Sequence, residues 1–515
     1  MLRCLWPSDY SPTKMECTLI ISSVDKFLDE ELTPRLILLL ILIALLSLAP
    51  RPHAQTLTLG KARLALNFDL PRSASLHLVE AAEYQPWRAE LWEMAGHYAL
   101  QGDDPQRAFA HFRRALAAGT LTASGYTEMG DAAQRLGDLP AALQAWQTAL
   151  QNGDEAIPLY TRLEVVHRQL NDYPALTADL RALTTLQPAD ASTFYRLGLV
   201  LAATQPESAL AYLTRAAELD AIYSPVVLTL WRSITTARLS EDSVYTLLLS
   251  GRALAAWNEW TLATEAFRRA TELRPDYAEA WAFLGEALQR LPSSSQTVQS
   301  GDLRSRASQP PPGLEELEKA VTLDPQSLVA NLFLALYWQR QLQFERALGY
   351  LHAAAEIEPR NPILQAEIGN TFAKTGDLPT AQTYYQRATE LSPNNAEVWR
   401  WLASFYIRYE TQLRDAGLSA ARQAVLLDPN DPASLDTMAQ IYTLLNDPLS
   451  AQRFLARALR ADPNYAPARL HLGLIYLLEG DPTRAYHQLT LARSLAAPDS
   501  PAADQSERLL QQYFP

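Results

Sequence analysis

The sequence predicts an all-α solenoid of antiparallel helix pairs. Three observations support this: a sequence motif that recurs about every 34 residues, apolar residues at helical spacing within the motif, and turn residues between its two halves. The chain of 515 residues is also longer than one hydrophobic core usually supports, as expected of an open-ended repeat array.

The repeat length is clearest from the prolines at the end of each motif. Pro325, Pro359 and Pro393 are 34 residues apart, and the next two closing prolines follow at spacings of 36 and 34 residues. A small residue lies near the start of each motif. These are Gly96, Gly130, Gly198, Gly251, Gly285, Ala335, Gly369, Ala403, Ala439 and Gly473.

The residues of each motif predict a helix, a turn and a second helix. In the first half, Trp399, Leu402 and Tyr406 fall at offsets of three and four, which place them on one helical face. Between the halves, "TGDLP" (375–379) offers a glycine to end one helix and an aspartate to cap the next. We expect the small residues to lie where the two helices cross.

The large–small–aromatic–Ala–aromatic–Ala–Pro pattern resembles the tetratricopeptide repeat family. It recurs in register from about 89 to 495, with a preceding partial unit at 59–86. The resemblance implies a right-handed superhelical array whose first helices line a concave binding face. It also implies that the protein acts by binding and is not an enzyme.

Several segments depart from the pattern and set the expected domain borders. Glu164, Leu176 and Leu183 replace small residues in one unit, so we expect a loosened helix crossing there. Residues 224–239 read as an extra helix, either a degenerate unit or a hinge. We therefore predict sub-arrays at 55–240 and 241–495, a flexible Ser/Gln/Pro-rich insertion at 291–312 and a capping helix at 496–515.

The N-terminal region contains the one strongly apolar stretch, "LILLLILIALLSLA" (36–49). After an extension at 1–35, we assign 36–54 as a signal-peptide core or membrane anchor, because the stretch is shorter than a usual membrane span and lacks a good cleavage site. The alternative is a buried helix of the fold. Export would place the array in the cell envelope, extracytoplasmic, although the charges on either side do not fix its orientation.

Composition excludes several functional classes. The net charge of −13 argues against a nucleic-acid partner. Only Cys4 and Cys17 are cysteines, the histidines are scattered, and neither a phosphate-binding loop nor a nucleophile elbow occurs. We expect no catalytic residues, no metal and no cofactor.

A cationic series marks the expected concave face. The thirteenth position of successive units holds Arg290, Arg340, Lys374 and Arg408, with Arg135 further upstream, and Asn370, Arg400 and Ser404 precede it on the same face. Such a series would suit an acidic peptide or an anionic polymer. The alternative is that these cations only stabilise helix C-termini.

Two other surfaces bear on partner choice. The family's carboxylate clamp for chaperone tails is not matched, because Leu332 and Ala366 stand where a lysine is needed. In the last unit, Leu470, Leu474, Leu477 and Leu478 form either a docking groove or a face covered by the C-terminal tail.

The sequence thus predicts a non-enzymatic scaffold that presents a groove to a protein or peptide partner of an envelope-associated complex. The alternatives are an accessory factor that binds an anionic or sugar polymer during export, and an enzyme with an unrecognised site. The sequence does not fix the oligomeric state.

Overall fold

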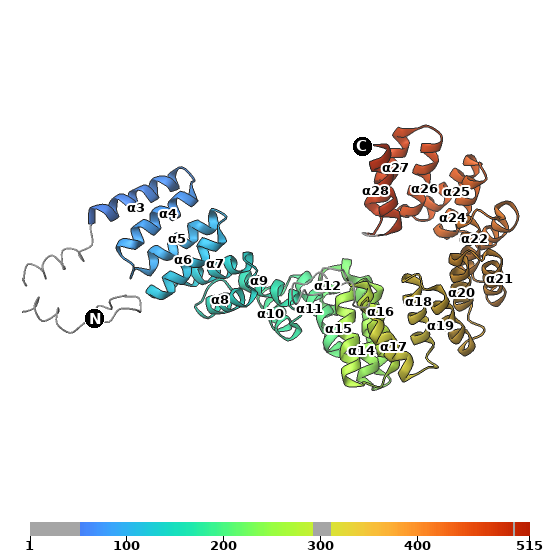
Figure 1. The fold of residues 1–515 in the computed structure, drawn as a ribbon, viewed down its shortest axis with the longest axis horizontal. Coiled ribbons are helices and arrows are strands. Elements are labelled where there is room, and N and C mark those ends of the chain that lie inside the picture. Colours follow the sequence, from blue (N-terminus) through green and yellow to red (C-terminus); the bar gives the residue numbers. More distant parts are fainter. Residues whose placement is uncertain (1–51, 292–310, 498–499, 515) are drawn as a thin grey trace, which may run out of the picture. The chain divides into compact units, whose positions relative to one another are not determined.

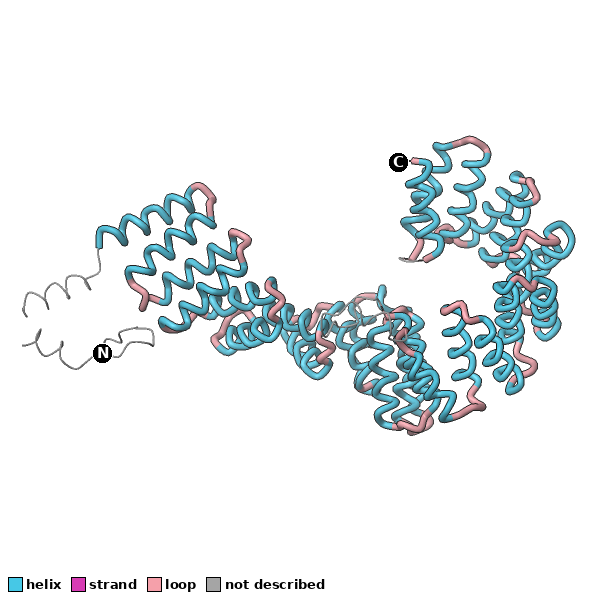
Figure 2. Tube along the Cα trace, in the orientation of Figure 1, coloured by secondary structure: helices cyan, strands magenta, loops and turns pink. Residues whose placement is uncertain are grey.

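The structure is a computed structural model that describes residues 52–291, 311–497 and 500–514. Every regular element in these ranges is a helix, and most connections are short loops (Figure 2). The predicted all-α array of helix pairs is therefore confirmed for the described residues. The apolar stretch at 36–49 and most of the insertion predicted at 291–312 lie outside them.

The described helices fall into two compact units divided between Pro188 and Ala189. The border predicted at 240 instead falls inside the second unit, just after its helix α13. The first unit consists of four consecutive helix pairs (Figure 1). They are α3 (Pro52–Asn67), α4 (Pro71–Tyr84), α5 (Ala89–Gln101), α6 (Pro105–Ala118), α7 (Ala123–Arg135), α8 (Leu139–Gln151), α9 (Ala156–Gln169) and α10 (Tyr173–Leu186).

The second unit continues the same alternation with one extra helix, α13, and two short helical turns. Its elements are α11 (Ala191–Thr204), α12 (Pro206–Leu219), η1 (Ala221–Tyr223), α13 (Ser224–Arg238), α14 (Ser243–Ala256), α15 (Trp260–Leu273), α16 (Ala278–Arg290), α17 (Leu314–Leu323), α18 (Leu328–Arg340), α19 (Phe344–Ile357), α20 (Pro362–Thr375), α21 (Leu378–Leu391), α22 (Ala396–Arg408), η3 (Leu413–Gly417), α23 (Leu418–Leu427), α24 (Pro432–Leu444), α25 (Pro448–Ala461), α26 (Ala466–Leu478), α27 (Pro482–Leu495) and α28 (Pro501–Tyr513).

Small residues lie where paired helices cross, as the sequence predicts. A Cβ atom placed on Gly130 of α7 would stand 2.4 Å from the Trp146 indole nitrogen on α8. Gly251 and Gly473 meet Phe267 and Leu489 in the same way, each sixteen residues later. The missing side chain lets a large residue of the second helix fill the crossing, so the two helices approach closely.

The turns between paired helices also follow the predicted chemistry. Asp138 and Asp377 accept hydrogen bonds from backbone N–H groups in the first turns of α8 and α21. Gly376 ends α20 with φ at 92°, a left-handed conformation that glycine adopts without strain. These caps fix where each second helix starts.

The prolines that close each unit take part in a second recurring contact. The Trp281 and Trp399 indole N–H groups each donate to the carbonyl of the proline six residues earlier, at 2.8 Å. Trp92 makes the same contact with Pro86 at 3.3 Å. These bonds satisfy a carbonyl in the link between units and so help to fix how consecutive units join.

The unit with altered crossing residues combines buried leucines with buried polar side chains. Among the repeats whose first and second helices both have thirteen or more residues, the two helices of the α9–α10 repeat pack least extensively against each other. Glu164 is fully buried at their crossing and pairs with Arg168. His167 of α9 and Asp179 of α10 form a buried pair at 2.6 Å, and burial raises the pKa of the Asp179 carboxyl. The predicted loosening agrees with this packing.

Helix α13 packs against α12 and α14 but does not separate α14 from the preceding first helix, α11. Helix α14 packs directly against α11, and the Ser250 hydroxyl donates to the Ala202 carbonyl at 2.6 Å. The segment at 224–239 is therefore an extra helix, as predicted, and the regular stacking of first helices continues past it.

The last helix, α28, packs against α26 and α27. Leu510 joins a cluster that includes Leu470, Leu474 and Leu477, while Leu478 is 77% exposed. Most of the leucine face is thus covered by the C-terminal tail, which favours the covered-face alternative over an open docking groove.

We predict that Gly130→Ala lowers the free energy of unfolding by about 1–3 kcal/mol, because its Cβ would collide with the rigid Trp146 indole. The matched control is Gly349→Ala in α19, where an added Cβ meets nothing within 4 Å. That variant should be neutral or stabilised by up to about 1 kcal/mol, the helix-propensity gain. Urea unfolding followed by circular dichroism measures both, and equal stability of the two variants would contradict the crossing model.

Candidate functional site

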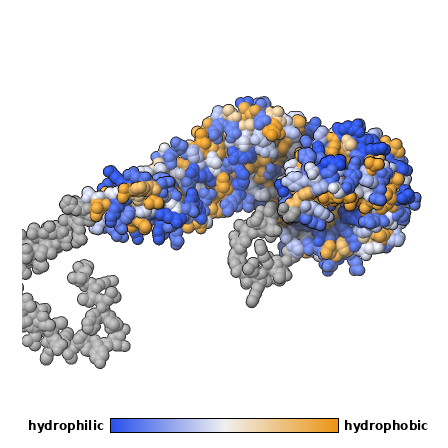
Figure 3. Space-filling model, turned by 90° about the horizontal axis from the view of Figure 1, so that it is seen from above, coloured by the Kyte–Doolittle hydropathy of each residue, from blue (hydrophilic) through white to orange (hydrophobic). Residues whose placement is uncertain are grey.

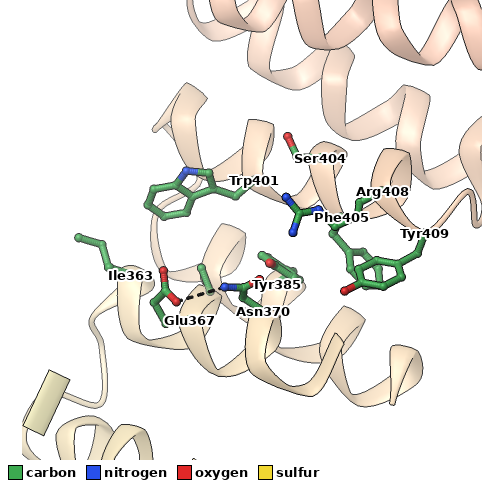
Figure 4. A pocket seen from close by; sticks show the side chains of 10 residues that line it. Ile363, Glu367, Asn370, Tyr385, Trp401, Ser404, Phe405, Arg408 and Tyr409 are labelled. Atoms are coloured by element: carbon green, nitrogen blue, oxygen red, sulfur yellow. Dashed lines mark hydrogen bonds between the residues drawn. The ribbon is translucent and has the colours of Figure 1, made fainter. Parts of the chain in front are cut away.

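The candidate site is a concavity of about 230 Å³ in the second unit, between the first helices of two consecutive pairs. Helix α20 contributes Ile363, Ala366, Glu367 and Asn370, and α21 contributes Tyr385. From α22 and the residue after it come Trp401, Ser404, Phe405, Arg408 and Tyr409. Figure 4 shows Glu367 and Asn370 across from Trp401 and Arg408.

The repeat positions these side chains. Gly369 and Ala403 lie at the helix crossings, so the neighbouring positions on α20 and α22 turn toward the concavity. Tyr385 enters from α21 because Gly369 leaves space beside its ring.

Aromatic rings form much of the wall. The centroids of Tyr385 and Phe405 are 5.2 Å apart, and those of Phe405 and Tyr409 are 5.6 Å apart. Burial raises the pKa of the Tyr385 hydroxyl, with a smaller contribution in the same direction from Glu367. Tyr385 is thus a neutral hydroxyl at physiological pH, able to donate or accept a hydrogen bond.

Arg408 is the cationic residue that lines this concavity. It has no ion-pair partner within the described residues 311–497. It is exposed and lines the concavity. On the facing helix, the Asn370 side-chain amide donates to Glu367 at 3.4 Å. The concavity therefore combines an available guanidinium, an acceptor carboxylate and flat aromatic surface.

The structure brings together three of the seven predicted residues: Asn370, Ser404 and Arg408. Lys374 lies one helical turn after Asn370, and its ammonium donates to the Gln339 side chain at 3.2 Å. Burial lowers the pKa of Lys374, Glu367 opposes this shift and Arg408 adds to it.

The other three predicted residues are occupied by partners within the chain. Arg290 and Arg340 both bind the Glu286 carboxylate, with Arg290 Nε 3.0 Å from Glu286 Oε1. Arg400 pairs with Asp431 at 2.7 Å. Upstream, Arg135 lies 3.4 Å from Asp103. The cationic series is therefore neutralised in part, and Lys374 and Arg408 carry what remains of it near the concavity.

Sequence reasoning missed the aromatic walls and Glu367. The cluster of aromatics in "WRWLASFYIRY" (399–409) is a signal that could have drawn attention to Trp401 and Tyr409. On the face drawn in Figure 3, hydrophobic and hydrophilic residues are interspersed.

A family model described as the C-terminal domain of cilia and flagella-associated protein 70, built of tetratricopeptide repeats, matches residues 292–509. This match agrees with the repeated helix pairs and crossing residues of the structure. The chain is a tetratricopeptide repeat protein.

Individual relatives are distant from this tetratricopeptide repeat protein. Protein O-mannosyl-transferase TMTC3 of Homo sapiens is 24% identical over 189 residues, which are 33% of this chain and 20% of that protein. The BBSome complex member BBS4 homolog of Drosophila melanogaster is 22% identical over 292 residues, 51% of this chain and 60% of that protein. The chain thus spans less than two thirds of either relative.

Two solved structures are similar to this chain at low identity. Yeast Tom70 is 14% identical, with 76% of this chain and 95% of that chain covered and a TM-score of 0.37. A tetratricopeptide repeat protein from Parabacteroides merdae is 13% identical, with 53% and 99% covered and a TM-score of 0.40.

No group of three His, Cys, Asp or Glu side chains within the described ranges could hold a metal ion. Likewise, no helix within those ranges combines the length and the apolarity that crossing a membrane requires.

We predict that Lys374 loses its proton below the usual range for lysine, and that Arg408→Gln raises its pKa by removing a nearby positive charge. Glu367→Gln should lower the pKa of Lys374, because the Glu367 carboxylate favours the charged ammonium. The pH dependence of Lys374 reaction with an amine reagent, followed by peptide mass spectrometry, measures these shifts. Identical profiles in all three proteins would show that the groups do not interact.

Proposed function

We propose that this protein is a non-enzymatic scaffold that binds a peptide segment of a protein partner in the groove of its second unit. The observation that carries the proposal is the concavity between α20 and α22, where the available guanidinium of Arg408 stands beside aromatic surface. Tetratricopeptide repeat arrays present such surfaces on first helices, and this site lies on them.

The chemistry of the site favours a partner segment with an acidic group next to an apolar or aromatic residue. A carboxylate could accept two hydrogen bonds from Arg408, while an adjacent side chain packs on Trp401 or Tyr409. Asn370 and Ser404 supply further polar groups for the backbone of an extended segment.

We further propose that the array works outside the cytoplasm as part of an envelope-associated complex, held by residues 36–54 as an uncleaved anchor or exported through them. The support is the apolar stretch at 36–49. The cysteine-free body after Cys17 is compatible with an oxidising compartment.

The alternative, binding of an anionic or sugar polymer, would draw on a continuous series of cations along the groove. Pairing of Arg290 and Arg340 with Glu286, and of Arg400 with Asp431, interrupts that series. The structure therefore gives more support to a short acidic segment than to an extended polyanion.

We predict that Arg408→Glu abolishes partner retention, whereas Arg387→Glu does not. Arg387 on α21 is a matched control because it is also exposed, without an ion-pair partner in the described structure, and outside the concavity. Tagged full-length proteins would capture partners from the native membrane fraction, with quantification by mass spectrometry.

Peptides from a captured partner would then be titrated against each variant. Loss of a charge-assisted hydrogen bond of about 1.5–3 kcal/mol corresponds to at least about tenfold weaker binding. Equal retention by Arg408→Glu, Arg387→Glu and the parent protein would overturn this site. Retention of a polysaccharide that decreases steeply with salt would instead favour the polymer alternative.

A further inference from the structure

Helix α3, the first described helix, has an exposed apolar face in addition to its buried one. Leu57, Leu64 and Phe68 are 62%, 57% and 69% exposed. Their offsets of seven and four place Leu57 and Leu64 in one line along α3, and Phe68 continues that line in the turn directly after the helix ends at Asn67. A separate face of α3 carries Ala62 and Ala65, which are buried, and Ala62 packs with Leu78 of α4 and Ala95 of α5.

The same exposed face is basic. Lys61 lies in line with the three apolar residues, four residues after Leu57. Arg63 is also exposed, at about 100° around the helix from Leu64, so it flanks this line and does not lie on it. Neither has an ion-pair partner among the described residues, and α3 contains no acidic residue. A helix with an apolar stripe and flanking cations suits the boundary between lipid headgroups and acyl chains, where long cationic side chains reach the phosphates.

The position of α3 in the chain fits this location. The apolar stretch at 36–49 ends three residues before α3 begins at Pro52. Three residues span at most about 10 Å. If the stretch enters a bilayer, the start of α3 is therefore held at the bilayer surface.

We propose that the face formed by Leu57, Lys61, Leu64 and Phe68 lies on the surface of an anionic lipid bilayer. This inference rests on the proposed membrane anchoring by residues 36–54. Lipid association would orient the first unit at the membrane through α3, in addition to the tether.

Charge favours an anionic bilayer on this face over two protein alternatives, which are the stretch at 36–49 of the same chain and a second copy of the chain. The stretch at 36–49 contains no charged residue, so folding back onto α3 would cover Lys61 without supplying an anion. A second copy of the same face would bring Lys61 and Arg63 close to identical cations. Lipid phosphates supply the missing negative charge while the acyl chains receive the apolar residues.

A single fluorescent probe tests the proposal in the full chain. Cys4→Ser and Cys17→Ser remove both native cysteines, and Leu64→Cys then carries an environment-sensitive label. The matched control is Leu239→Cys, at a leucine 85% exposed in the second unit. Both proteins are reconstituted into vesicles of equal phosphatidylcholine and phosphatidylglycerol, with or without lipids that carry a nitroxide quencher near the headgroup.

The proposal predicts several-fold stronger lipid quenching at position 64 than at position 239, and a selective decrease at 64 when Lys61 and Arg63 are changed to Glu. Equal access of aqueous iodide to both positions would overturn it. A shielded label at 64 that lipid nitroxide does not quench would also overturn it, in favour of protein cover. If the protein fails to float with the vesicles, the anchoring itself is wrong, an outcome distinct from an anchored protein whose α3 faces water.

Discussion

The close crossing of paired helices is the constraint on which the rest of this structure depends. A first-helix position without a bulky side chain admits a large residue from the second helix, as where Gly130 meets Trp146 or Gly251 meets Phe267. This contact fixes the rotation of each first helix about its axis, and therefore which residues reach the groove. Asn370, Ser404 and Arg408 line one concavity because Gly369 and Ala403 hold α20 and α22 in that orientation.

Two repeats depart from the close crossing of paired helices, and they show what this crossing contributes to the other repeats. Where Glu164 replaces the small residue, α9 and α10 pack less extensively, and the buried His167–Asp179 pair forms part of the contact between them. Where α13 is inserted, α14 packs on α11 as well as on α13, which preserves the stacking of first helices. The array thus tolerates a changed crossing and an added helix, provided that consecutive first helices remain in contact.

The sequence was sufficient to predict the helix pairs, their crossings and the capped turns, because each is set by residues close together in the chain. The site was predicted less completely. Arg340 pairs with Glu286, 54 residues away, and the intervening insertion hides that α16 and α18 are neighbours. The helical pattern placed Arg408 on the correct face, but whether a cation is free depends on side chains of adjacent units. The role of Tyr385 was missed because core packing and groove lining require the same residue type.

The most direct test of the crossing constraint is a double-mutant cycle on Gly251 and Phe267. Gly251→Ala introduces a collision, Phe267→Leu alone removes buried volume, and the double variant should relieve part of the collision. Urea unfolding of the parent and three variants gives the coupling free energy. The account predicts a favourable coupling of about 1 kcal/mol, with the double variant more stable than the sum of the single changes allows. Strict additivity would contradict it, because the two residues would then not share the space at the crossing.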